Sequence, residues 1–150
     1  MKLNVITKAF NELTNEELYC VLHLRNHVFI VEQNCIYLDI DNKDQNCHHV
    51  LIYDETNLIG YSRIVPAGLS YEQVSFGRVL INPEYRGKGL GKTIIEESIK
   101  SCYNVFGNAD IKIGAQLYLL TLYQSFGFVA DGEQYDEDGI MHIDMIKVKL

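Results

Sequence analysis

Tryptophan is absent from this 150-residue sequence, and proline occurs only twice. The four cysteines are irregularly spaced and include no C-x-x-C pair, which excludes a disulfide scaffold and favours a reducing, cytoplasmic setting. No apolar run approaches the ~20 residues that span a bilayer, because Arg25, Asn26 and His27 interrupt the longest one. Polar residues also break the N-terminal segment before a signal peptide could form. We therefore expect no export signal and no membrane partner.

An excess of positive charge is also lacking. Twenty acidic residues against 13 basic ones leave a net charge of -7, which argues against a nucleic-acid partner held through its phosphates. Hydrophobic residues make up 47% of the chain. A chain of this length buries roughly 68–70% of its unfolded surface, enough for one core. We expect a single domain over residues 1–150.

The apolar periodicity predicts strands and helices that alternate from the middle of the chain onward. Thr14 and Glu17 form a capping box at the start of a helix whose apolar face includes Arg25, and this arginine needs a partner. A loop follows from residue 32 to 49. Further strands are expected at 50–53, 58–65, 74–81, 111–114, 128–135 and 140–148, and further helices at 90–103 and 117–126. This order predicts an α/β or α+β fold with a mixed sheet.

A glycine-rich turn joins the predicted strand 74–81 to the predicted helix 90–103. Residues 86–92 read Arg-Gly-Lys-Gly-Leu-Gly-Lys, so three glycines alternate with other residues and three cations accompany them. Glycine allows positive φ and close approach of a ligand to the backbone, and a helix N-terminus offers unpaired N–H groups to an anion. A diphosphate or polyphosphate is the expected ligand.

The spacing of the glycines narrows the choice of phosphate ligand. A dinucleotide fingerprint needs G-x-G-x-x-G, but after Gly87 and Gly89 the third glycine comes one residue early, at position 91. A Walker A loop needs a glycine at the position of Arg86. The pattern that does match is R-x-x-G-x-G, and here the sequence resembles the pyrophosphate loop of the GNAT superfamily of acyl-CoA-dependent N-acyltransferases.

Other segments extend this resemblance almost from end to end. Pro83-Glu84-Tyr85 precedes the loop, and residues 122–128 are similar to the family's helix end and the Gly-Phe start of its next strand. Within the superfamily the chain resembles the ElaA group, on residues 25–33, 39–49, 77–79, 115–118 and 132–143. The resemblance implies a GNAT-type fold, with a central, mixed, mostly antiparallel twisted sheet flanked by helices. It also implies an acetyl-CoA-dependent N-acetyltransferase with no metal, acting on a primary amine of a small molecule or a peptide.

The resemblance assigns most of the expected coenzyme contacts to one strand and the loop. Backbone N–H groups of the strand would receive the thioester oxygen, the loop would bind the diphosphate, and Gln116 stands where related enzymes often carry an Asn that touches CoA. The expected coenzyme-binding residues are Val79, Leu80, Ile81, Arg86, Gly87, Lys88, Gly89, Leu90, Gly91, Lys92 and Gln116. The apolar strand residues can serve as core at the same time, because they act through the main chain.

Catalysis by direct transfer needs a proton donor for the leaving thiolate and a base for the amine. Tyr123 occupies the position of the family's helix tyrosine, the expected general acid. Several family members place a glutamate where this chain has Ile111, so another base is needed. Glu32, Glu133 and His142 are the candidates. Each also has an ordinary structural explanation; Glu32, for example, could pair with Arg25.

Acidic residues of the 32–49 loop could attract a cationic acceptor. We expect Arg25, Asp39 and Asp41 on the substrate side of the site, with a solvated polar loop as the alternative. The segment Cys47-His48-His49 does not predict zinc, because adjacent ligands on a strand point to opposite faces. An EF-hand is excluded as well, because its glycine and glutamate positions hold Asp44 and Val50.

Two other functions remain open on the sequence alone. The missing strand glutamate is compatible with an acyl-CoA-binding regulatory module without catalysis. Gly91-Lys92-Thr93 is compatible, less well, with a P-loop-like nucleotide binder. An exposed strand near the C-terminus could pair two chains in a homodimer.

Overall fold

The strands of the chain form two antiparallel sheets. The computed structural model describes all residues 1–150. The first sheet has the order β1-β2-β3-β4. Its strands are β1 (Leu3–Ala9), β2 (His48–Asp54), β3 (Asn57–Val65) and β4 (Ser75–Ile81). The second sheet places β8 between β5 on one side and β6 and β7 on the other. Its strands are β5 (Ile111–Gln116), β6 (Val129–Ala130), β7 (Tyr135–Glu137) and β8 (Ile140–Lys147).

The helices connect these strands and cover the sheets. The longer ones are α1 (Asn15–Arg25), its π-helical continuation η2 (Asn26–Glu32), and α2 (Leu90–Phe106), while α3 (Leu120–Gln124) is short. Single turns of 3₁₀ helix are η1 (Phe10–Glu12), η3 (Asp44–Asn46), η4 (Pro83–Tyr85) and η5 (Leu117–Leu119). No helix has both the length and the apolar character needed to cross a bilayer.

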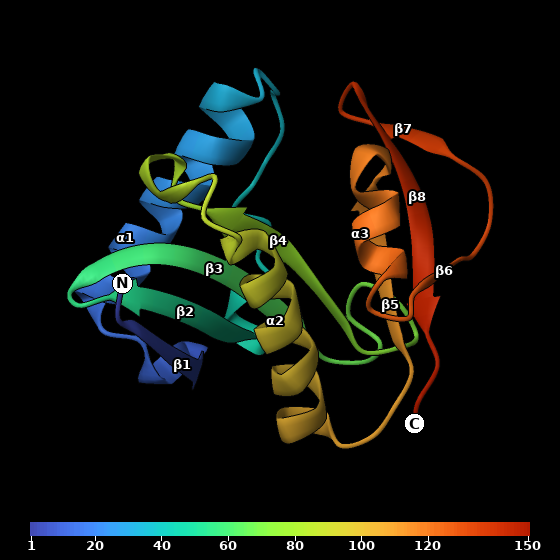
Figure 1. Cartoon of the computed structure of the whole chain (residues 1–150), viewed down its shortest axis with the longest axis horizontal. Coiled ribbons are helices and arrows are strands. Elements are labelled where there is room, and N and C mark those ends of the chain that lie inside the picture. Colours follow the sequence, from blue (N-terminus) through green and yellow to red (C-terminus); the bar gives the residue numbers. More distant parts are fainter.

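The two sheets are joined at one point and diverge from it. Val74 and Ile111 form a parallel bridge, and the Lys112 amide donates to the Val74 carbonyl at 2.9 Å. Beyond that bridge no strand pairs with the second edge of β4. Figure 1 shows β4 and β5 separating toward the top of the view, with α2 beside β4 and α3 beside β5. The divergence leaves backbone groups of β4 free to meet a ligand.

A shared hydrophobic core lies where the sheets meet. Ile94 and Ile95 of α2 are buried together with Phe76 of β4, Ile113 of β5 and Met145 of β8. A smaller cluster packs α1 and η2 against the opposite face of the first sheet. The alternating and helical apolar patterns of the sequence are therefore buried as expected.

Most expected elements are confirmed, with three differences. Strand β1 gives little signal in the sequence, because Asn4, Thr7 and Lys8 interrupt its apolar residues. The expected strand 128–135 is wrong in its centre: it breaks into β6 and β7 around Gly132, whose φ is +107°. The expected helix 117–126 begins as the 3₁₀ turn η5. The capping box is confirmed, since the Glu17 amide donates to Thr14 Oγ1 at 3.1 Å and the Thr14 amide donates to Glu17 Oε1 at 2.8 Å.

Candidate active site

A cleft of about 1010 Å³ occupies the space between the diverging sheets. Its walls are β4, the glycine loop with the start of α2, the end of β5 with α3, and the β7–β8 hairpin. The loop between η2 and η3 also contributes to the wall, through residues that include Tyr37 and Asp41. The cleft therefore brings together segments from both halves of the chain.

The glycine loop opens directly onto this cleft. Gly87 and Gly89 have φ of +79° and +76°, and α2 begins immediately after Gly89. A Cβ added at Gly87, Gly89 or Gly91 would meet no atom within 4 Å, so the backbone there is fully accessible. The first N–H groups of a helix have no partner within the helix, and its dipole favours an anion. The loop thus fits a diphosphate.

The cations of the loop differ in where they lie. Arg86, Gly87, Gly89, Leu90 and Gly91 line the cleft, whereas Lys88 and Lys92 do not. The Lys88 ammonium lies over the ring of Tyr85, 5.4 Å from its centroid, and Lys92 is exposed. Arg86 is consequently the cation best placed to meet a phosphate inside the cleft.

A bulge interrupts the middle of β4. Tyr61 pairs with Leu80 and Arg63 with Gly77, so two residues of β4, Arg78 and Val79, lie opposite the single Ser62. Arg78 has a φ of +51°, which is uncommon outside glycine. Bulges often occur beside active sites, where they redirect backbone and side chains. Val79, Leu80 and Ile81 follow the bulge, and all three line the cleft.

The Arg78 side chain anchors the bulge to the loop that follows η2. Its Nε donates to Asp39 Oδ1 at 2.7 Å, and Nη2 donates to the Asp39 carbonyl at 3.2 Å. The guanidinium also lies over Tyr37, 5.6 Å from the ring centroid. These contacts offset the strain of the positive φ, which is of order 1–3 kcal/mol.

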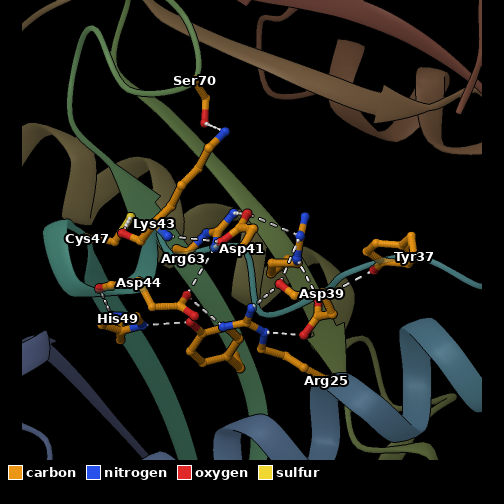
Figure 2. Close-up of polar contacts among 12 residues, drawn as sticks. Arg25, Tyr37, Asp39, Asp41, Lys43, Asp44, Cys47, His49, Arg63 and Ser70 are labelled. Carbon is orange, nitrogen blue, oxygen red and sulfur yellow. Dashed lines mark hydrogen bonds and ion pairs between the residues drawn. The ribbon is translucent and has the colours of Figure 1, made fainter.

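Beneath the bulge lies a buried network of ion pairs, shown in Figure 2. Arg25, at the end of α1, is 0% exposed. Its Nε donates to Asp39 Oδ2 at 2.9 Å and its Nη1 to Asp44 Oδ1 at 2.7 Å. Arg63 of β3 donates to both oxygens of Asp41, at 2.8 and 2.9 Å. The network fixes the loop on the first sheet.

Charge pairing within the network lowers the pKa of Asp41 and of Asp44. Burial acts to raise the pKa of Asp41, but the hydrogen bonds and charge of Arg63 outweigh it and bring the pKa to about 2. Burial likewise opposes ionisation of Asp44, yet Arg25 and Arg63 together lower its pKa. His49 Nε2 donates to the Asp44 carbonyl at 3.0 Å, and His49 Nδ1 lies 2.6 Å from Tyr61 Oη. The histidine thereby ties β2 and β3 to the start of η3.

The network corrects the expectation for Arg25. Its guanidinium is fully buried, is bonded to aspartates and does not line the cleft, which does not favour a contact with substrate. Its partners are Asp39 and Asp44, not Glu32. Asp39 is also nearly buried, whereas Asp41 lines the cleft while bonded to Arg63.

Glu32 instead pairs with the arginine of the glycine loop. Arg86 Nη2 lies 2.6 Å from Glu32 Oε1 and Nη1 lies 2.9 Å from Oε2, a two-point contact at the cleft wall. The hydrogen bonds from Arg86 lower the pKa of Glu32, which weakens it as a base. Glu32, a candidate base, and Arg86, a candidate for binding the phosphate, are thus bonded to each other.

Tyr123 and Gln116 lie on the opposite wall. Tyr123, from α3, is 5% exposed, lines the cleft and packs edge-on against Phe128, with the ring centroids 5.9 Å apart. Burial raises the pKa of Tyr123, so the phenol keeps its proton at neutral pH. Gln116 ends β5 and also lines the cleft. Its register partner on β8 is His142.

The remaining candidate bases, His142 and Glu133, differ in whether they line the cleft. His142 is 7% exposed and lines the cleft, beside Glu137 of β7. Glu133 is exposed, lies between β6 and β7, and does not line the cleft. Glu137 had no role in the sequence-based expectation, although it stands inside the ElaA-like segment 132–143. Its neighbour His142 is five residues away in sequence. The register pairs Glu137 with Ile140 and Tyr135 with His142, so Glu137 and His142 are diagonal neighbours that only this register brings together.

A further polar cluster closes the base of the cleft. Asp144 Oδ1 accepts hydrogen bonds from Tyr71 at 3.0 Å and from Tyr135 at 2.7 Å. A Cβ at Gly114 would come within 2.9 Å of both phenol oxygens, which explains why β5 carries a glycine there. Burial raises the pKa of Tyr71 to about 12. These tyrosines bridge the β3–β4 loop to the second sheet.

Comparisons with known proteins agree with this geometry. The family described as Acetyltransferase (GNAT) domain matches residues 11–149. Protein ElaA of Escherichia coli K12 is 38% identical over 139 residues, covering 91% of each chain. The crystal structure of E. coli ElaA superposes with a TM-score of 0.90 at 35% identity, covering 97% of this chain and 99% of that one.

A second solved structure is similarly close. It is described as an acyl-CoA N-acyltransferase from Pseudomonas aeruginosa, and it has a TM-score of 0.93 at 34% identity, covering 98% of this chain and 100% of that one. Both matches extend over the diverging sheets and the glycine loop. This chain has the GNAT acyl-CoA N-acyltransferase fold and belongs to the GNAT acetyltransferase family, in its ElaA-like group.

Proposed function

We propose that the protein is an N-acetyltransferase that moves an acetyl group directly from acetyl-CoA to a primary amine of a small molecule or a peptide. The observation that carries this proposal is the common cleft. An anion-binding glycine loop, the unpaired edge of β4 and the buried phenol of Tyr123 all line it. The coenzyme, the hydrogen-bond donors to the oxyanion and the proton donor would thereby meet in one site.

The first task of the chain is to bind and orient the thioester. The N–H groups at the start of α2 and the Arg86 side chain would bind the diphosphate, with Gln116 beside the pantetheine arm. Backbone N–H groups of the β4 segment 79–81 would stabilise negative charge on the thioester oxygen. The ion network under Arg78 holds that segment in place.

The second task is to move protons around the transfer. A C–N bond forms between the amine and the acetyl carbon, the C–S bond breaks, and the sulfur leaves as a thiolate. Tyr123 would donate its phenolic proton to that sulfur, and the proton that the nitrogen loses as the amide forms would restore the phenol. His142 would accept the proton that the ammonium must lose before attack, because Glu32 is paired with Arg86 and Glu133 lies outside the cleft.

The proton donor can be tested with Tyr123→Phe. We expect kcat to fall about 100-fold, with little change in the KM for acetyl-CoA, because the ring stays in place while its proton is lost. Thiol release from acetyl-CoA with a panel of primary amines measures this. Tyr19→Phe, on the exposed surface of α1, is the matched control and should retain the wild-type rate. An unchanged rate for Tyr123→Phe would remove this residue as the acid.

One observation favours a second function. The residue at the family's strand-glutamate position, Ile111, is 1% exposed and packed in the core, so it contributes no charge to the site. An acyl-CoA-binding regulatory module would need only the loop. Tight CoA binding in calorimetry, without turnover of any amine, would support that module over the enzyme.

A further inference from the structure

The ring of His142 is held in one tautomer. Its Nδ1 lies 2.7 Å from the carbonyl oxygen of Ile140, and because a carbonyl can only accept, Nδ1 must carry a hydrogen. In the neutral ring the lone pair is then on Nε2, which forms no hydrogen bond within the protein. The ring stacks on Tyr135 with centroids 5.8 Å apart and an interplanar angle of 22°. Backbone and stacking together fix the direction of Nε2.

A carboxylate faces this lone pair. Glu137 Oε2 lies 3.4 Å from His142 Nε2, and both residues line the cleft. With the neutral ring, two hydrogen-bond acceptors lie 3.4 Å apart without a donor between them. The arrangement becomes favourable when an N–H donor is supplied, either by protonation of Nε2 or by a ligand. A primary ammonium has three N–H groups and can donate to both acceptors at once.

The charges around the pair favour a cation. Glu137 has no ion-pair partner other than His142, and Asp136 and Asp138 flank it on the same hairpin. The Tyr135 hydroxyl donates to Asp144, so the Asp144 carboxylate is bound away from the pair. Gln116, the register partner of His142 on β5, is uncharged. No lysine or arginine forms an ion pair with this hairpin. The position is therefore one of negative potential with an available lone pair.

We propose that Glu137 and His142 form the acceptor-binding subsite, which takes an aliphatic primary ammonium whose remaining atoms carry no negative charge. This proposal rests on the proposed N-acetyltransferase function and specifies its substrate class. Glu137 binds the ammonium and His142 Nε2 takes one of its protons. In that step an N–H bond of the ammonium breaks and an Nε2–H bond forms. The positive charge moves to the imidazolium, which Glu137 stabilises, and the amine nitrogen gains the lone pair for attack.

The substrate class is tested with three amines of equal chain length. The probes are n-butylamine, 1,4-diaminobutane and 4-aminobutanoate, whose far ends are neutral, cationic and anionic. We expect kcat/KM to be highest for 1,4-diaminobutane and lowest for 4-aminobutanoate. Glu137→Gln should raise the KM for all three amines about tenfold, because Glu137 binds the ammonium that they share, with the KM for acetyl-CoA unchanged. Glu96→Gln, an exposed glutamate on α2, is the matched control.

The proton transfer is tested with His142→Gln. This variant should lower kcat about 100-fold with the KM for acetyl-CoA unchanged, because its amide cannot take a proton from the ammonium. Because His142 is buried and its replacement could affect folding, the exposed Glu137→Gln variant tests the subsite independently. A wild-type KM for all three probes in Glu137→Gln would overturn the proposal.

A readout without turnover separates this proposal from the proposed function. The ring resonances of His142 in a proton–carbon NMR spectrum should shift when 1,4-diaminobutane is added to the CoA complex, and should not shift in Glu137→Gln. Unmoved wild-type resonances would overturn the subsite. If CoA binds but no amine is acetylated, the enzymatic function fails; if acetylation occurs with unchanged Glu137→Gln kinetics, only the subsite fails.

Discussion

Arginine–carboxylate pairs occur at two places in this protein, and the two differ in burial. The Arg25 network with Asp39 and Asp44 lies beneath β4, and its arginine is 0% exposed. The Arg86–Glu32 pair lies at the cleft wall, where the side chains are 45% and 36% exposed. Distances are similar in both, 2.6–2.9 Å, so geometry alone does not distinguish them.

Burial determines what each arginine can do. Removing one partner from a buried pair leaves an unpaired charge in a poorly solvated place, so the Arg25 network cannot open at low cost. An exposed pair is solvated in both its open and closed states and contributes roughly 0–1 kcal/mol. In the proposed coenzyme site, Arg86 would therefore exchange Glu32 for a phosphate at low cost, whereas Arg25 would not exchange its aspartates. The first network is structural and the second pair is available to a ligand.

The largest effect should come from opening the buried network. Arg25→Ala is expected to lower the free energy of unfolding by roughly 3–5 kcal/mol, because Asp39 and Asp44 each lose one of their two arginine partners while buried. Urea denaturation followed by circular dichroism measures this. The matched Arg86→Ala variant should stay within about 1 kcal/mol of wild type. Equal losses of unfolding free energy in the two variants would show that burial does not distinguish the two sites.

Acid should weaken the buried network at a defined pH. The pKa of Asp41 is lowered from 3.8 to about 2 and that of Asp44 is also lowered, so both stabilise the folded state above pH 3.8. This stabilisation is lost as the pH falls toward 2. The urea midpoint should therefore decline over that interval. Replacing Asp41 by Asn should make the decline smaller, and an equally steep decline in that variant would assign the effect to other groups.

The smallest effect concerns the exposed pair. Glu32→Gln should leave stability unchanged and tighten CoA binding up to about fivefold, because Arg86 no longer has a competing anion. Arg86→Ala should weaken CoA binding instead. Isothermal titration calorimetry with CoA at low and high salt measures both, and the difference should shrink with added salt. Weaker CoA binding in Glu32→Gln would indicate that the carboxylate supports the loop rather than competing for it.

Local patterns made much of this molecule predictable from its sequence. The capping box at Thr14, the positive φ at Gly87 and Gly89, and the helix that begins at Leu90 all depend on neighbouring residues. The buried faces of the strands follow from their alternation of apolar residues. Even the need of Arg25 for a partner was visible, since an arginine on an apolar helix face must be paired.

Features that depend on long-range pairing were not predictable in the same way. The partners of Arg25 lie 14 and 19 residues away, in a loop without periodicity. The bulge at Arg78 depends on the register between β3 and β4, and Glu137 meets His142 only through the hairpin register. Glu32 was one of three candidate bases, and the sequence offers no sign that Arg86, 54 residues later, would pair with it.

The two sheets pair only at the bridge between Val74 and Ile111, so a rotation of one sheet relative to the other would pivot there. The seven residues of β4 that follow this bridge have a length of about 23 Å, at ~3.3 Å per residue. A rotation of about 5° between the halves would displace the far end of that segment by about 2 Å, close to the radius of a methyl group. Such a rotation would widen the cleft between β4 and β5 while every ladder hydrogen bond within each sheet stays intact.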